Sequence, residues 1–321
     1  MSSRSDGGSE PDGRIFGRDM GMLCASRFFF FSGHNAILVM LAPFLVGRGA
    51  DPAQAGLAVG AAGVVSIASR LVAGWWSDQH GRKPILVIGA LITAAVAFSY
   101  GYVQSYNSVL ALRMLEGIAG GAFLTTTWTL AAMLTPSGRR GEAFGLFTVV
   151  SSMAIGAAPL VAIFLESRWG FRAVFSVASL CFILALVCVV ILRDRPAVPL
   201  PTGAATSYKG MLRPGVLIPS LAGASAMFVH GGVQAFLILF AAQRGIVHAG
   251  LFFTIYSLIG LCSRVFVGRA GDRFGIRTVT LPSLFILSVG LFLLGTARSL
   301  PALVFAAVIY GLGFAAVNPL V

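Results

Sequence analysis

The chain has 321 residues, of which 57% are hydrophobic and only 11% are charged, and its formal net charge is +12. Soluble domains carry about 25% charged residues, so this composition excludes an ordinary soluble protein. It predicts an all-α, polytopic membrane protein with about ten spans of roughly 20 residues each. A nucleic-acid partner is not expected, because the basic residues separate apolar segments instead of forming one face.

The first half begins with a polar stretch, residues 1–19, which predicts a disordered tail. Six apolar segments follow, at about 20–46, 53–77, 84–103, 108–134, 143–165 and 169–192. Each is long enough to cross a bilayer as a helix, so residues 20–192 are predicted to form a six-helix bundle. The four cysteines lie in apolar segments without metal-ligand spacing, and we predict no metal site, disulfide or cofactor.

The first apolar segment carries His34 and Asn35 near its middle. Polar side chains at that depth cost free energy and often serve function. Histidine also changes its charge near neutral pH, so His34 is a candidate for binding substrate or protons. A locally hydrogen-bonded histidine is the alternative.

The turn between the second and third segments reads S-R-L-V-A-G-W-W-S-D-Q-H-G-R-K-P over residues 69–84. Gly74 would let two helix backbones approach closely, and Gly81 would supply the positive φ of a tight reversal. Asp78 can meet the positive N-terminus of another helix, while Arg82 and Lys83 favour the cytoplasmic side.

Arg70 lies eight residues before Asp78 in this turn. Two interpretations are open. Its long side chain could reach the cytoplasmic interface. It could instead join Gly74 and Asp78, on the same helix face, in a charge network that latches a cytoplasmic gate.

The fourth segment contains R-M-L-E-G-I-A-G-G, from Arg113 to Gly121. Arg113 and Glu116 are three residues apart, so on a helix they share one face and can neutralise each other. The pair is either structural or functional. Gly117 and Gly121 form a smooth strip against which another helix can pack.

A polar, proline-rich linker over residues 193–212 separates the two halves. Four further apolar segments follow, at about 215–242, 250–270, 279–297 and 301–321. The turn after the second of them repeats the earlier pattern, since Asp78 and Asp272, like Gly81 and Gly275, are 194 residues apart (272 − 78 and 275 − 81). Five residues recur in this frame, namely Ser263, Arg264, Gly268, Asp272 and Gly275, while Ile276 replaces the arginine that follows the glycine in the first copy and Arg277 comes after it. The chain is therefore interpreted as two related halves.

The pattern G-x-x-x-D-x-x-G-R-K, from Gly74 to Lys83, resembles the signature loop of the major facilitator superfamily. The resemblance implies two six-helix bundles and secondary active, proton-linked transport of a small solute by alternating access. The R-x-x-E-G pattern at Arg113 is similar to the superfamily's fourth-span pattern, whose arginine is linked to proton coupling or to substrate charge. Because the chain stops in its tenth segment, we predict a 6+4 arrangement whose incomplete C-terminal bundle, residues 213–321, lacks the last two helices.

The first segments of the two halves are related by a spacing of 196 residues, which carries His34 to His230 (230 − 34). In the superfamily these helices line the central cavity. The resemblance therefore implies that His34 and His230 bind substrate or take up protons, with Asn35 and Gln234 as polar neighbours. Two unrelated, locally hydrogen-bonded histidines are the alternative.

Lysine and arginine also predict the orientation. The loops after even-numbered segments carry eleven of them and the opposite loops carry five, which favours a cytoplasmic N-terminus in the cell's inner or plasma membrane. We expect a monomer in the lipid bilayer with a small-molecule substrate and protons as partners. No hydrolase, metalloprotease or nucleotide-loop motif occurs, so an enzyme is not expected. The alternatives are a non-transporting receptor or scaffold, an inactive fragment of a transporter, and an intramembrane enzyme.

Overall fold

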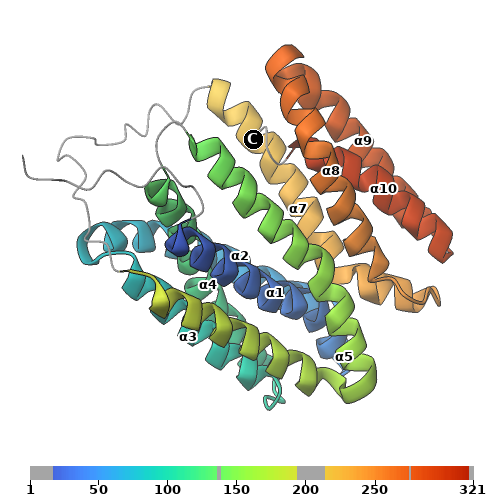
Figure 1. Cartoon of the computed structure of the whole chain (residues 1–321). Coiled ribbons are helices and arrows are strands. Elements are labelled where there is room, and N and C mark those ends of the chain that lie inside the picture. The colour runs from blue at the N-terminus through green and yellow to red at the C-terminus, as the bar shows by residue number, and fades with distance from the viewer. Residues whose placement is uncertain (1–16, 136–138, 194–213, 275, 318–321) are drawn as a thin grey trace, which may run out of the picture.

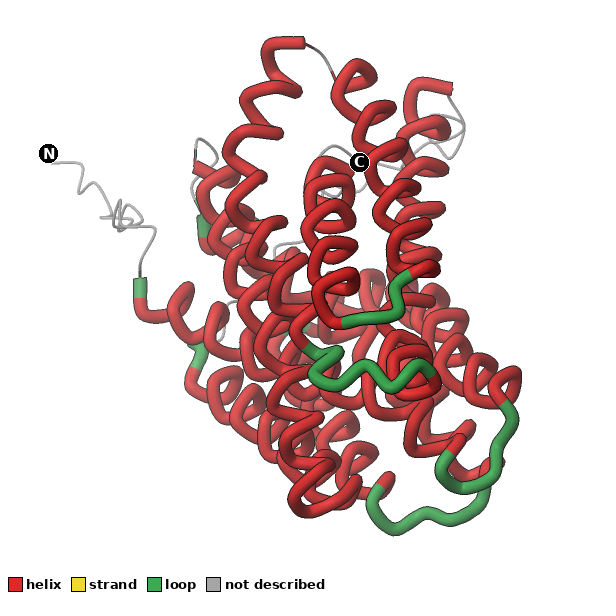
Figure 2. The backbone as a smooth tube through the Cα atoms, turned by 90° about the vertical axis from the view of Figure 1, so that its right-hand side faces the viewer, coloured by secondary structure: helices red, strands yellow, loops and turns green. Residues whose placement is uncertain are grey.

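The computed structural model of the chain describes residues 17–135, 139–193, 214–274 and 276–317. Within these ranges every regular element is a helix and no strand occurs (Figure 2), which confirms the predicted all-α fold. The described helices are α1 (Arg18–Val46), α2 (Pro52–His80), α3 (Lys83–Tyr100), α4 (Tyr106–Leu134), α5 (Arg140–Ile191), α7 (Pro214–Gln243), α8 (Leu251–Phe274), α9 (Ile276–Thr296) and α10 (Leu300–Val317).

Helix α5 is interrupted at Gly170, whose φ of 75° and ψ of 179° lie outside the helical region. Glycine adopts a positive φ without the steric cost of a Cβ. The chain reverses direction in α5, as the green and yellow-green parts of this helix show in Figure 1. The two parts correspond to the fifth and sixth predicted segments.

The ends of α2 follow from local sequence. The side chain of Asp51 accepts a hydrogen bond from the Gln54 N–H at 2.7 Å, and the Gln54 side chain accepts one from the Asp51 N–H at 3.1 Å. This reciprocal pair satisfies N–H groups that the helix leaves free. At the other end Gly81 has a φ of 86°, and its N–H donates to the Ser77 carbonyl at 3.1 Å. The positive φ predicted for Gly81 is confirmed.

Seven of the described helices are long and apolar enough to cross a membrane. One of them, α5, extends over 52 residues, or about 78 Å at 1.5 Å per residue, which is enough for two crossings once the helix breaks at Gly170. Helices α8 and α10 contribute the shorter apolar stretches Leu251–Ser263 and Leu300–Ala315. Each of the ten predicted segments thus has a helical counterpart, and the polytopic arrangement is confirmed.

The helices pack around two clusters of buried apolar side chains. The first lies among α1 to α5 and includes Phe30 stacked on Phe123, with ring centroids 4.0 Å apart. The second lies among α7 to α10 and includes Tyr310; Figure 1 shows α8, α9 and α10 side by side. Val39 and Met40 of α1 belong to the second cluster, so α1 contacts both halves. The predicted linker at 193–212 lies almost wholly outside the described residues, and the domain boundaries stay a prediction.

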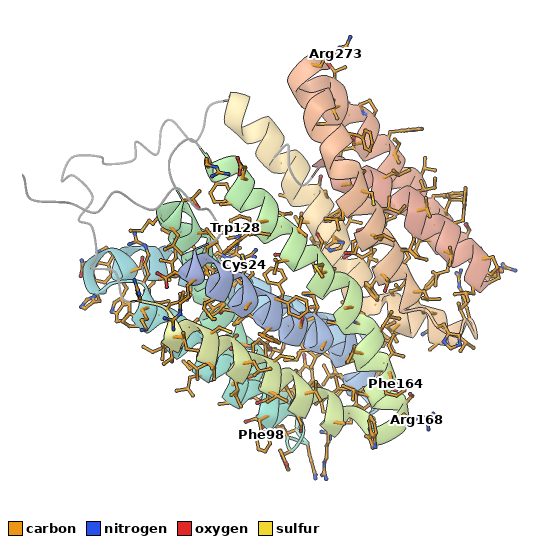
Figure 3. The ribbon with its side chains drawn as sticks, in the orientation of Figure 1. Cys24, Phe98, Trp128, Phe164, Arg168 and Arg273 are labelled. Carbon is orange, nitrogen blue, oxygen red and sulfur yellow. The ribbon has the colours of Figure 1, made fainter. Side chains whose placement is uncertain are left out.

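The bundle has two ends, which we name by their turns. The motif end carries the Gly81 turn between α2 and α3, and the far end carries the turn between α1 and α2 at Asp51. Figure 3 shows Arg273 of α8 at one end of the molecule and Phe98 of α3 and Arg168 of α5 at the opposite end.

Hydrogen bonds between the halves lie toward the far end. The Gln234 side chain of α7 donates to Asn35 Oδ1 of α1 at 3.2 Å. The Thr254 hydroxyl of α8 donates to the Gly156 carbonyl of α5 at 2.7 Å. The Ser257 hydroxyl of α8 also donates to the Ser152 carbonyl of α5, at 2.5 Å.

Candidate functional site

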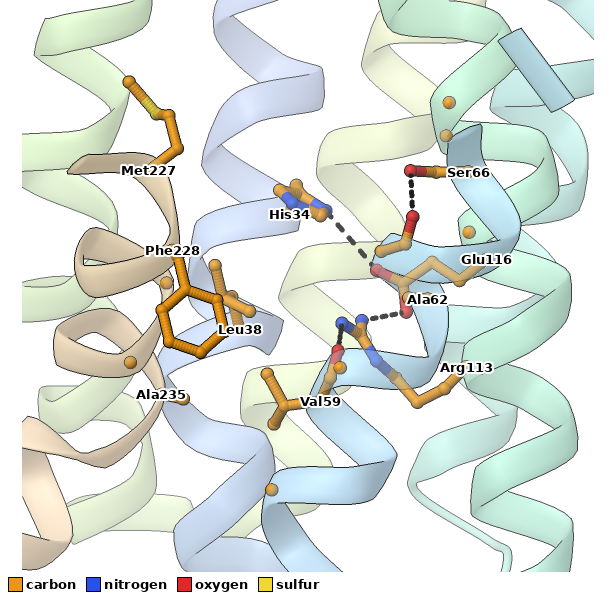
Figure 4. Close-up of a pocket in the computed structure, with 18 of the residues that line it drawn as sticks. His34, Leu38, Val59, Ala62, Ser66, Arg113, Glu116, Met227, Phe228 and Ala235 are labelled. Carbon is orange, nitrogen blue, oxygen red and sulfur yellow. Dashed lines mark hydrogen bonds and ion pairs between the residues drawn. The ribbon is translucent and has the colours of Figure 1, made fainter. Parts of the chain in front are cut away.

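A cavity of about 540 Å³ lies between α1, α2, α4 and α7. Its size falls within the roughly 300–1,000 Å³ of small-molecule sites. Of the predicted cavity residues, His34, Arg113 and Glu116 line it, and so does Arg70 from the signature loop. Figure 4 shows these α1 and α4 side chains on one side of the cavity and Phe228 of α7 on the other.

Arg113 and Glu116 form an ion pair on α4, with Nη1 and Oε2 2.8 Å apart. They are only 1% and 2% exposed. The spacing of three residues places them on one face, as the sequence predicts. The Tyr100 hydroxyl of α3 donates to the same carboxylate oxygen at 2.9 Å. Arg113 Nη2 donates to the Val59 carbonyl of α2 at 3.3 Å, so the pair ties three helices together.

The second carboxylate oxygen of Glu116, Oε1, faces His34. The His34 Nδ1 lies 3.4 Å from it, and the His34 side chain is 29% exposed. That separation is long for a hydrogen bond, and among the described residues Oε1 has no hydrogen-bond partner. A buried acceptor without a partner costs free energy. A proton on His34, or a donor on a bound solute, would remove this cost.

Glycines on α4 bring α2 close to the ion pair. A Cβ on Gly117 would lie 2.4 Å from the Ala62 carbonyl oxygen, and one on Gly121 would lie 2.5 Å from Ser69 Oγ. Both distances are shorter than real Cβ contacts allow, so the close packing predicted for Gly117 and Gly121 is confirmed.

The family model described as "Major Facilitator Superfamily" matches residues 23–321. The chain belongs to the major facilitator superfamily. Among curated relatives, an uncharacterized MFS-type transporter of Methanocaldococcus jannaschii is 22% identical over 278 residues, covering 83% of this chain and 72% of the relative. A multi-drug resistance efflux pump PmrA homolog of Lactococcus lactis is 23% identical, covering 77% of this chain and 65% of the relative. The chain thus spans about two thirds of the length of these relatives.

Solved structures of transporters share the fold. A bacterial homolog of the human lysosomal transporter Spinster, in an inward-facing and unoccupied conformation, has a TM-score of 0.77 at 17% identity and covers 94% of this chain and 73% of that one. A D-xylose-proton symporter has a TM-score of 0.72 at 19% identity and covers 92% of this chain and 80% of that one.

Of the residues that the sequence assigns to the signature loop and its gate, Arg70 is the one described at the cavity. The exposed side chain of Arg70 forms part of the cavity lining. A Cβ on Gly74 would meet nothing within 4 Å among the described residues, so the close helix contact expected there is not found. Lys83 Nζ donates to the Leu192 carbonyl at 2.6 Å, which satisfies a carbonyl at the end of α5. The side chain of Asp78 lies outside the described residues.

Arg82 directly precedes α3 as its N-cap residue. The second copy of the superfamily loop falls largely outside the described residues. Gly275 is not described, and nothing is described of the side chains or surroundings of Arg264, Gly268, Asp272 and Arg277. The gate that the two copies are predicted to form stays a prediction.

His230 is not among the residues that line the cavity between α1, α2, α4 and α7. It is buried, with its Nδ1 2.8 Å from the Tyr310 hydroxyl and its Nε2 3.4 Å from the Tyr256 hydroxyl. Gln234, one turn further along α7, reaches Asn35 of α1 instead. The structure therefore brings His34 to Glu116, and Asn35 to Gln234, but it does not bring the two histidines to one cavity.

Sequence reasoning missed three residues of the site, Tyr100, Met227 and Phe228. Tyrosine near a span end ordinarily marks the membrane interface, so nothing in the sequence indicates that Tyr100 is buried against Glu116. Met227 and Phe228 look like any apolar residues of a span. Within the described residues no group of three His, Cys, Asp or Glu side chains could hold a metal.

Proposed function

We propose that this superfamily member is a secondary active transporter that moves a small solute by alternating access, with the signature loop on the cytoplasmic side of the cell membrane. In this proposal the solute binds in the cavity between α1, α2, α4 and α7. The hydrogen bonds between the halves at the far end support an inward-facing arrangement, in which the motif end is the open one.

We further propose that transport is linked to protons at His34. The observation that carries this step is the buried Glu116 carboxylate, in which Arg113 and Tyr100 satisfy Oε2 while Oε1 faces His34 without a hydrogen-bond partner. Because Arg113 and Tyr100 already bond to Glu116, this proposal assigns the proton that is gained and lost to His34, which lines the cavity beside them.

The expected cycle follows from this geometry. A proton on His34 makes Nδ1 a charged donor to Oε1 and draws α1 toward α4. Loss of the proton weakens that contact and frees the cavity wall. Proton uptake at one face and release at the other would then be coupled to the change of access.

The test uses proteoliposomes that contain the pH-sensitive dye pyranine, challenged with a panel of small anionic, neutral and cationic solutes. We expect at least one solute to cause proton movement with the wild-type chain. His34→Gln should reduce this movement to the level of protein-free liposomes while leaving exchange of the same solute at equal pH measurable. His248→Gln, which makes the same change at an exposed position in the turn between α7 and α8, should behave as wild type. Normal proton movement with His34→Gln would refute the coupling.

A further inference from the structure

The cavity carries more positive than negative charge. Its described ionisable lining consists of His34, Arg70, Arg113 and Glu116. Glu116 is neutralised by Arg113 at 2.8 Å. Arg70 remains as an unbalanced cation, since its exposed side chain has no hydrogen-bond or ion-pair partner among the described residues. A protonated His34 would add to the positive charge.

The opposite wall of the cavity is apolar. Met227 and Phe228 of α7 line it and are 43% and 86% exposed. Figure 4 shows the Phe228 ring on α7 across from Arg113 and Glu116 on α4, with Leu38 beside it. An aromatic side chain exposed to this degree within a cavity leaves a flat face for an apolar ligand group.

Glycines contribute much of the cavity lining. Gly117, Gly120 and Gly121 of α4 all border the cavity, together with Gly231 and Gly232 of α7. Gly117 and Gly121 are covered by α2, but a Cβ on Gly231 or Gly232 would meet nothing within 4 Å, so the α7 side of the cavity is free of side chains at these two positions.

We infer that this cavity binds an amphipathic organic anion, whose acidic group pairs with Arg70 and whose flat apolar body lies against Phe228. This inference rests on the proposed function and adds the substrate class to it. A guanidinium forms bidentate hydrogen bonds with a carboxylate, and it does so most strongly where water is partly excluded. A cationic solute would have to compete with Arg113 for Glu116 and would meet the charge of Arg70.

The test compares three probes that share one ring system, namely 2-naphthoate, 2-naphthamide and 2-naphthylmethylammonium, bound to the purified chain in lipid nanodiscs by calorimetry. The wild type should bind 2-naphthoate at least about tenfold more tightly than the other two. Arg70→Gln should remove this preference, and Arg70→Lys should keep part of it, because lysine retains the charge without the planar fork. Arg168→Gln, an equal charge change at the exposed far end, should leave the preference intact.

A second pair of variants tests the apolar wall. Phe228→Ala should weaken binding of all three naphthyl probes by a similar factor, since it removes the ring face they share. Phe305→Ala, at an exposed position of α10 away from the cavity, should have no effect. The wall assignment is wrong if Phe228→Ala changes only one probe or none.

The outcomes separate this inference from the proposed function. Tighter binding of 2-naphthylmethylammonium than of 2-naphthoate, an unchanged preference in Arg70→Gln, or no binding of any probe would overturn the inference. If the chain transports 2-naphthylmethylammonium into proteoliposomes, the transport proposal stands and the anion assignment fails. If 2-naphthoate binds through Arg70 but no solute of any charge is moved, the anion assignment stands and the transport proposal fails.

Discussion

At the residue scale, the buried Arg113–Glu116 pair sets the chemistry of the site. Two charges in the interior of a membrane bundle are costly unless each has partners. Arg113 bonds to Glu116 and to the Val59 carbonyl, and Glu116 also accepts from Tyr100. Removing one member leaves the other charged and unpaired, whereas removing both leaves an apolar gap.

This asymmetry gives a prediction about stability. Glu116→Gln should lower the free energy of unfolding by about 3–5 kcal/mol, because Arg113 is left as a buried, unpaired cation. The double variant Arg113→Met with Glu116→Leu should recover most of that loss. Thermal unfolding of the detergent-purified variants measures both. A Glu116→Gln variant as stable as wild type would show that the ion pair contributes little to the stability of the fold.

The sequence allowed only part of this network to be predicted. The Arg113–Glu116 pairing follows from a spacing of three on one helix, which requires no knowledge of packing. The contact of His34 with Glu116 depends on how α1 is rotated against α4, and helix rotation is set by tertiary packing. The symmetric spacing of His34 and His230 does not place both at the cavity, because His230 lies on another face of α7, where it contacts Tyr256 and Tyr310.

At the element scale, the closest helix contact near the site is that of α2 with α4. It depends on the absence of a side chain at Gly117, where a Cβ would fall 2.4 Å from a backbone oxygen. Gly120, on the same helix, has only the Phe30 ring within range, at 3.8 Å. The two glycines therefore differ in their surroundings, as expected if the packing strip consists of Gly117 and Gly121 and not of Gly120.

We predict that Gly117→Ala destabilises the chain by about 1–3 kcal/mol, because the backbones of α2 and α4 must move apart. Gly120→Ala should be neutral or slightly stabilising, since alanine favours the helix and has room. Thermal unfolding of the two variants side by side gives the comparison. Equal stability of both would mean that α2 is not packed on α4 as closely as described.

Helix α5 shows what apolar patterning can and cannot predict. The sequence indicates two spans, at 143–165 and 169–192, because the polar residues between them interrupt the apolar pattern. The structure continues helix on both sides of a single reversal at Gly170. Composition locates the crossings, but the residue at which the backbone turns is decided by the one glycine that takes a positive φ.

At the scale of the whole molecule, the repeated loops and the spacing of apolar segments predicted a helical bundle in two related halves. They did not predict at which end of the bundle hydrogen bonds would connect the two halves. Contacts between the halves, such as Ser257 Oγ donating to the Ser152 carbonyl at 2.5 Å, depend on how the helices pack and not on the apolar pattern. In the proposed cycle the chain would exchange these contacts for others at the opposite end, and the access state would then be an equilibrium that the apolar pattern does not encode.

Alternating access is tested most directly by pulsed electron-spin distance measurements on two label pairs, in a background with the four free cysteines replaced. One pair joins the exposed positions Gln79 and Arg273 at the motif end, and the other joins the exposed positions Arg168 and Val247 at the far end. The proposal predicts that changes of pH or added 2-naphthoate shift the two distances in opposite directions, with the motif end closing as the far end opens. Distances that stay fixed in every condition, or that lengthen and shorten together, would contradict it.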